Sequence, residues 1–93
     1  MTDREMFRAL ADIGREIGAR ILYGRPRHRG GACTWQTSDF VVIHRDSEFE
    51  ERIALLLEYL ADKNLDGVEM PQAVRDRIDL AQREEGVKSG VQR

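Results

Sequence analysis

The chain has 93 residues, of which 41% are hydrophobic and 34% are charged, with a formal net charge of -2 and a pI near 5.7. A chain of this length can bury only one core, and its hydrophobic content excludes the disordered class. The acidic balance excludes a protein that coats nucleic acid with its whole surface, because such a protein needs an excess of Lys and Arg. A local basic patch stays compatible with these values.

Cysteine usage and hydropathy restrict where the protein works. The single cysteine cannot form an internal disulfide, and the first residues, MTDREMFRAL, are polar and periodic, unlike a signal peptide. The longest apolar runs, FVVI and ALLL, have four residues each, against the roughly 20 needed to cross a bilayer. We therefore expect a cytoplasmic protein without a membrane segment.

The first expected element is a helix that begins after Thr2. Thr2 and Glu5 fit a capping box. Apolar residues then recur at steps of three and four, which is one helical face: Met6, Leu10, Ile13, Ile17 and Ile21. We expect Gly18 to end the helix as its C-terminal cap, followed by a short strand, Ile21 to Tyr23. The alternative is a longer helix whose glycines permit a close backbone approach.

Two β-rich stretches, GACTWQ and DFVVIHR, follow and predict a hairpin. Neither central turn residue is a glycine, so we expect a connection longer than a tight primed turn. Strand alternation places Cys33 and Trp35 on one face of the second strand, and Val41 and Ile43 on one face of the third.

The strongest amphipathic stripe lies in a predicted helix from Ser47 to Lys63, which we expect to be the centre of the core. Ser47 and Glu50 fit a second capping box. The apolar residues of this stripe are Phe49, Ile53, Leu56, Leu57 and Leu60.

A third helix is predicted to begin at Pro71, after an exit turn at Asn64 to Gly67, with Val74 and Ile78 on its apolar side. From Arg83 the apolar stripe ends, which predicts fraying. The predicted fold is α+β, ordered helix, short strand, β-hairpin and two helices, with a small antiparallel or mixed sheet packed on the central helix. We expect a single domain over 1–85 and a flexible tail over 86–93.

The segment between Arg20 and Arg29 holds four arginines and no acid, whereas Asp39 to Asp62 holds seven acids and two arginines. Cations and glycines in the loop, with aromatic rings nearby, are typical of sites for phosphate or single-stranded nucleic acid, but also of a solvated connection. The candidate anion-binding residues are Arg25, Arg27, His28 and Arg29. The candidate interface residues are Tyr23 and Trp35.

The remaining chemistry-bearing residues predict neither a metal site nor a nucleophile. His28, Cys33 and His44 lack the close ligand pair typical of zinc sites. A reactive thiol would need Cys33 and His44 side by side, which their spacing does not require. We interpret Cys33 as a small buried thiol, and we expect no catalytic residue, no metal and no cofactor.

The hairpin and the helix that follows, GGACTWQTSDFVVIHRDSEFEERIALLLEYLA, resemble the ImmA/IrrE group of zinc-dependent bacterial peptidases over roughly residues 13 to 61. In that group the helix carries H-E-x-x-H, and at these positions this chain has Leu57, Glu58, Tyr59, Leu60 and Ala61. Both metal-binding histidines are replaced, so the resemblance implies a relative without the zinc site. The chain is also similar to small bacterial proteins with a GGxC hairpin and a P-x-x-x-R helix start, here Pro71 to Arg75.

The sequence favours a small non-catalytic protein-interaction or regulatory module. The incomplete catalytic set, the split charge pattern and the small core together indicate a protein partner or a second copy of the chain. The first alternative is a nucleic-acid or phosphate-binding domain that uses the basic loop 25–29. The second alternative is an inactive peptidase-like domain.

Overall fold

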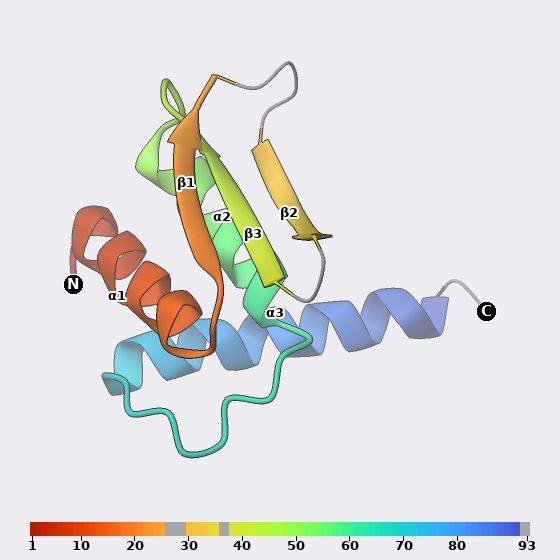
Figure 1. Cartoon of the computed structure of the whole chain (residues 1–93). Helices are drawn as coiled ribbons and strands as arrows, with labels where there is room; N and C mark the ends of the chain where they lie inside the picture. Colours follow the sequence, from red (N-terminus) through yellow and green to blue (C-terminus); the bar gives the residue numbers. More distant parts are fainter. Residues whose placement is uncertain (26–29, 36–37, 92–93) are drawn as a thin grey trace.

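The computed structural model describes the backbone of residues 1–25, 30–35 and 38–91, and the side chains of residues 1–25 and 39–84. Its fold is α+β, as predicted (Figure 1). The elements in chain order are α1 (Asp3–Glu16), β1 (Arg20–Gly24), β2 (Gly30–Trp35), β3 (Ser38–His44), α2 (Phe49–Leu60) and α3 (Gln72–Val91).

The sheet is mixed and has the strand order β1-β3-β2. The central strand β3 pairs in parallel with β1 and antiparallel with β2. Trp35 lies opposite Ser38, so strand pairing continues until only residues 36 and 37 separate the two strands. The expectation of a longer connection was therefore wrong, because the ladder uses nearly every residue of the hairpin for pairing.

The boundaries of α1 follow from local chemistry and confirm the prediction. The Thr2 hydroxyl accepts from the Glu5 amide at 3.2 Å, and the Glu5 carboxylate accepts from the Thr2 amide at 3.1 Å. Gly18 has φ of +100°, and the Ala19 amide donates to the Gly14 carbonyl at 2.9 Å. This Schellman ending requires a left-handed residue, and glycine adopts that conformation without the penalty of a Cβ atom.

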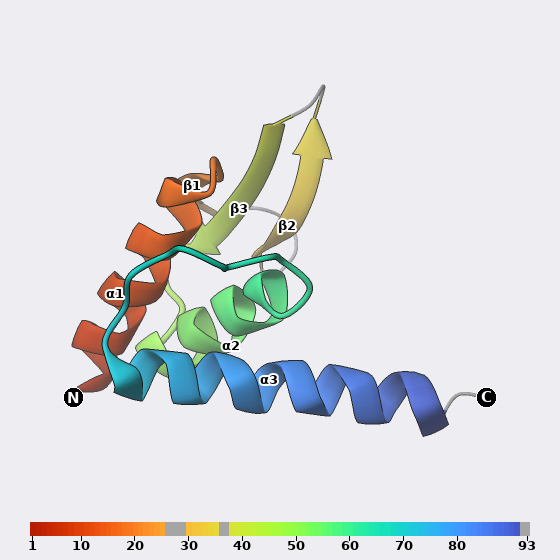
Figure 2. The same ribbon diagram turned by 90° about the horizontal axis from the view of Figure 1, so that it is seen from below.

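Two helix layers cover one face of the sheet. Figure 2 shows α1 and α2 beneath the strands, and α3 crosses on the far side of these helices. The core lies between the sheet and the helices, and its completely buried large side chains are Leu10, Val41, Ile43, Leu56, Leu60 and Val74. Each such side chain contributes about 1.5–3 kcal/mol through removal from water.

The predicted capping box at Ser47 and Glu50 was wrong. α2 begins at Phe49 with Glu48 as its N-cap, and no side chain caps it. The reason is that the Ser47 hydroxyl has other partners. It donates to the His44 carbonyl at 2.6 Å and accepts from the Arg52 side chain at 3.1 Å.

The segment between α2 and α3 contains the predicted turn. The Asn64 side chain accepts from the Asp66 amide at 2.9 Å, and Gly67 has φ of +83°. In α3, Val74 and Ile78 are buried, as the apolar pattern predicted. The helix does not end near Arg83 but continues to Val91. Once the first turns of α3 have formed, each further residue adds a backbone hydrogen bond and needs no apolar stripe. The division between a domain 1–85 and a tail 86–93 stays a prediction.

Candidate functional site

The face of the sheet that points away from the helices is apolar and uncovered by any described helix (Figure 2). Val41 and Ile43 point toward the helices, so alternation turns Phe40 and Val42 the other way. Strand register pairs Arg20 with Phe40 and Leu22 with Val42. We call the surface formed by Arg20, Leu22, Phe40 and Val42 the open face. The Leu22 side chain is 46% exposed there.

Arg20 partly shields the open face at one end. Its guanidinium lies over the Phe40 ring, 5.9 Å from the centroid. The aliphatic stem of an arginine can cover apolar surface while the charge stays in water. The open face therefore combines an apolar centre with one cation at its edge.

The register also places the two candidate aromatic residues. Tyr23 pairs with Ile43, so it lies on the helix side of the sheet, not on the open face. Trp35 pairs with Ser38, which places its backbone position on the open-face side, while its side chain lies outside the described part. The two candidate interface residues thus occupy positions on opposite faces of the sheet, and their interface role stays a prediction.

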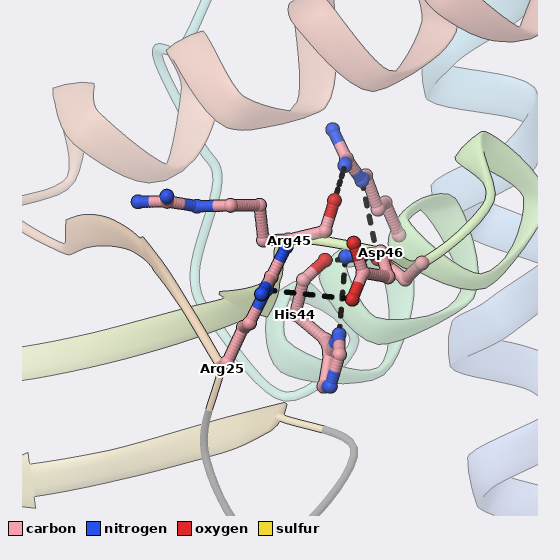
Figure 3. A network of polar contacts seen from close by, with 6 residues as sticks. Arg25, His44, Arg45 and Asp46 are labelled. Carbon is pink, nitrogen blue, oxygen red and sulfur yellow. Dashed lines mark hydrogen bonds and ion pairs between the residues drawn. The ribbon is translucent and has the colours of Figure 1, made fainter.

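A second candidate site lies at the carboxyl ends of the parallel strands β1 and β3, where the basic segment begins (Figure 3). Arg25 is exposed, and its Nε lies 3.5 Å from Oδ2 of Asp46. The Asp46 amide donates to Nδ1 of His44 at 3.1 Å. In the neutral imidazole this hydrogen bond assigns the proton to the other ring nitrogen, Nε2. The remaining candidates, Arg27, His28 and Arg29, lie outside the described residues.

Arg52 connects the turn that follows β3, at Arg45 and Asp46, to the helices. We call this turn the strand-end turn. Its Nη2 donates to the Arg45 carbonyl at 3.1 Å, and its Nε donates to the Ser47 hydroxyl at 3.1 Å. Its guanidinium also lies over three aromatic rings, 5.5 Å from the centroid of Phe7, 5.9 Å from that of Tyr23 and 5.4 Å from that of Phe49. These partners use both the donors and the face of the guanidinium, so Arg52 is a structural link.

The sequence reasoning missed this Arg52 cage, formed by Arg52 with Phe7, Tyr23 and Phe49. The available signal was one arginine inside the most apolar helix of the chain, three residues after Phe49. Its other partners come from α1 and β1, which are distant in sequence, so no local pattern identified them.

A cleft of about 300 Å³ lies beside α2 and is lined by His44, Ser47, Glu51, Arg52 and Glu58 among others. In the resemblance to the peptidase motif, Glu58 stands at the glutamate position. Leu57, which stands at the position of the first histidine, is half-buried, and Ala61, at that of the second, is buried. Neither Leu57 nor Ala61 lines this cleft. The inactive-peptidase alternative stays a prediction.

The strand register separates Cys33 from His44. Cys33 lies opposite Phe40, four residues along β3 from His44, which is about 13 Å at the rise of a strand. A thiol activated by an imidazole requires hydrogen-bond contact, and this backbone separation does not allow it. Within the described residues, no group of three or more His, Cys, Asp or Glu side chains could hold a metal ion.

A partly buried polar contact joins α2 to the sheet. The Tyr59 hydroxyl donates to the Asp39 carboxylate at 2.7 Å, and Nζ of Lys63 lies 3.4 Å from the same oxygen. Burial, together with the neighbouring carboxylate, raises the pKa of Tyr59 far above its ordinary value. Tyr59 therefore stays a protonated donor, which suits a structural hydrogen bond.

Comparisons with models of protein families, with curated proteins and with solved structures found no match to this chain. In the part of the chain that the structure describes, no helix is both long and apolar enough to span a membrane.

Proposed function

We propose that this chain is a small non-catalytic protein-interaction module that pairs reversibly with a second copy of itself through the open face. The observation that carries this proposal is the exposure of Leu22, at 46%, in the edge strand β1 of an apolar sheet face. Its register partner Val42 is only partly buried, and Phe40 on the same face is as well. A contiguous apolar patch on a small domain is typical of an interaction site.

The size of the open face agrees with a weak dimer. Together with the neighbouring backbone of β2, the open face spans three strands about 4.8 Å apart, each rising about 3.3 Å per residue, and this area is roughly 300 Å². Two such faces in contact bury about 600 Å² or somewhat more, whereas a standard stable interface buries about 1,600 Å². We therefore expect a dimer that forms and dissociates with protein concentration, as suits a regulatory contact.

The position of Arg20 favours a dimer in which the strands of one copy run opposite to those of the other. Arg20 begins β1, and the strand ends four residues later at Gly24, about 13 Å away. A two-fold axis that reverses the strands places Arg20 of each copy over the other end of its partner. The two guanidinium groups then stay apart, while the apolar centres meet.

The test is the mass of the protein in solution as a function of concentration, measured by light scattering or sedimentation. We expect the mass to rise from the 10.7 kDa of one chain toward twice that value. Leu22→Gln buries an amide without partners in the interface and should keep the protein monomeric. Leu80→Gln is the matched control, because Leu80 is 50% exposed but lies on α3.

A wild-type protein that stays monomeric at millimolar concentration contradicts the proposal. So does a dimer that Leu80→Gln weakens as much as Leu22→Gln does. Circular dichroism of each variant establishes that the fold is retained.

The second candidate function is phosphate or nucleic-acid binding by the basic loop 25–29. It is favoured by the position of Arg25 at the carboxyl ends of two parallel strands, where ligands bind in many α/β proteins. The ion pair with Asp46 opposes it, because that carboxylate already neutralises part of the charge of Arg25. Salt-sensitive oligonucleotide binding that is lost when the loop arginines become alanine would support it.

A further inference from the structure

A groove of about 220 Å³ lies between α1, the end of β1 and the start of α2, on the helix side of the sheet. Figure 1 shows α1 running beside β1 at this place. The groove is separate from the open face, because its strand residue, Tyr23, points toward the helices. The lining consists of arginines from α1, aromatic rings and one alanine, and it contains no carboxylate.

The cations form a row along one side of α1. Arg4, Arg8 and Arg15 line the groove, and the helical rise separates Arg4 from Arg8 by about 6 Å and Arg8 from Arg15 by about 10 Å. Arg15 also pairs with Asp12 at 3.2 Å. Within the described part of the chain, Arg4 and Arg8 form no ion pair. Two cations are thus unneutralised, and a third is shared.

The aromatic rings form the other side. Phe7 is buried and its ring lies 5.8 Å from that of Phe49, while Tyr23 and Phe49 are 46% and 38% exposed. Exposed rings beside a row of cations are what a nucleic-acid base and its phosphates require, because the base stacks and the phosphate accepts charge-assisted hydrogen bonds. Arg52 lies over all three rings and adds positive charge behind them.

We propose that this groove binds a segment of single-stranded nucleic acid, with phosphates along Arg4, Arg8 and Arg15 and a base stacked on Tyr23. The size of the groove favours a strand over a free nucleotide. Pockets that enclose small molecules have volumes of about 300–1,000 Å³, so 220 Å³ is too small to enclose a nucleotide. A strand lying across the groove needs no enclosure, and its further phosphates reach the neighbouring cations.

The test is the fluorescence anisotropy of a labelled oligothymidine of about ten nucleotides with the full chain. Three phosphate contacts predict a slope of log K against log salt of about -2, which is about a 15-fold loss of affinity between 50 and 200 mM salt. We expect Arg8→Ala to reduce that slope by about 0.7. Arg77→Ala is the matched control, because Arg77 is an exposed arginine on α3, outside the groove, and it should leave the slope unchanged.

The stacking part of the proposal has its own variants. We expect Tyr23→Leu to weaken binding about tenfold and Tyr23→Phe to retain it, because only the ring is required. A thermal melt of each variant monitors the fold. The groove proposal is overturned if no single strand binds at low salt, if Arg8→Ala acts no differently from Arg77→Ala, or if a mononucleotide binds as tightly as the strand.

Two further variants separate this proposal from the others. Leu22→Gln, which should abolish self-association, is expected to leave oligothymidine affinity unchanged, so the dimer and the groove can fail independently. A variant with Arg25, Arg27 and Arg29 replaced by alanine tests the basic loop. If that variant loses binding while Arg8→Ala and Tyr23→Leu do not, the loop is the binding site and the groove is not.

Discussion

The two faces of the sheet carry similar side chains but differ in what covers them. Val41 and Ile43 point toward the helices and are completely buried, whereas Leu22, on the opposite face, is 46% exposed. Helices α1 and α2 cover one side of the strands, α3 packs behind them, and no helix of the described chain lies on the other side. The covered face therefore stabilises the fold, whereas the open face leaves apolar surface exposed to solvent.

The largest expected effect tests the covered face. Leu56 of α2 is completely buried, so Leu56→Ala should lower the free energy of unfolding by about 2–5 kcal/mol through lost burial and the cavity it leaves. Leu22→Ala on the open face should change it by no more than about 0.5 kcal/mol at a protein concentration where the chain is monomeric. Urea denaturation followed by circular dichroism measures both values. Equal losses would show that the two faces do not differ in burial.

A smaller effect tests the link between the helices and the strand-end turn. Arg52→Met keeps an unbranched side chain of similar length but removes two hydrogen bonds and the charge over three rings. We expect a loss of about 1–3 kcal/mol in the free energy of unfolding. The matched control is Arg77→Met on α3, an exposed position, which should have almost no effect. A loss no larger than that of the control would contradict a structural role for the Arg52 cage.

The smallest expected effect concerns the hydrogen bond between Tyr59 of α2 and Asp39 near the start of β3. The pKa of Tyr59 is higher in the folded protein than in the unfolded chain. The hydrogen bond therefore stabilises the fold fully below the ordinary tyrosine pKa of about 10. This stabilisation is lost as the pH rises from about 10 through the folded pKa. Tyr59→Phe should lower the free energy of unfolding by about 0.5–1.5 kcal/mol at neutral pH.

The same variant should reduce the loss of stability in alkaline solution. Urea denaturation of the wild type and Tyr59→Phe at a series of pH values above neutrality gives this difference directly. The Lys63 ion pair with Asp39 is present in both proteins, so the difference between the two curves reports the Tyr59 hydroxyl. Parallel curves at all pH values would contradict the assigned role of the Tyr59 hydroxyl.

Much of the fold was predictable because it depends on local chemistry. The Thr2 and Glu5 side chains complete a capping box within one turn, and Gly18 ends the same helix through its own backbone conformation. The second capping box failed because Ser47 had a competing partner in Arg52, which sequence spacing does not reveal. A pattern that fits a motif thus predicts it only where no tertiary contact competes for the same groups.

The candidate sites were less predictable. Arg25 and Tyr23 were singled out from the sequence, but Tyr23 contributes to a groove with Arg4 and Arg8, which no sequence pattern had indicated. An arginine on a helix surface is ordinary by itself. It becomes part of a candidate site only when a strand and a second helix place aromatic rings beside it.

The sequence by itself determined the elements: a helix with two defined ends, strands that alternate between two apolar faces, and an amphipathic central helix. Only the tertiary structure decided which face of the sheet the helices cover, where Arg52 finds its partners and which arginines lie beside Tyr23. The physical reason is separation along the chain. Periodicity and capping operate over a few residues, whereas Phe7 and Phe49 meet across 42 positions through packing alone.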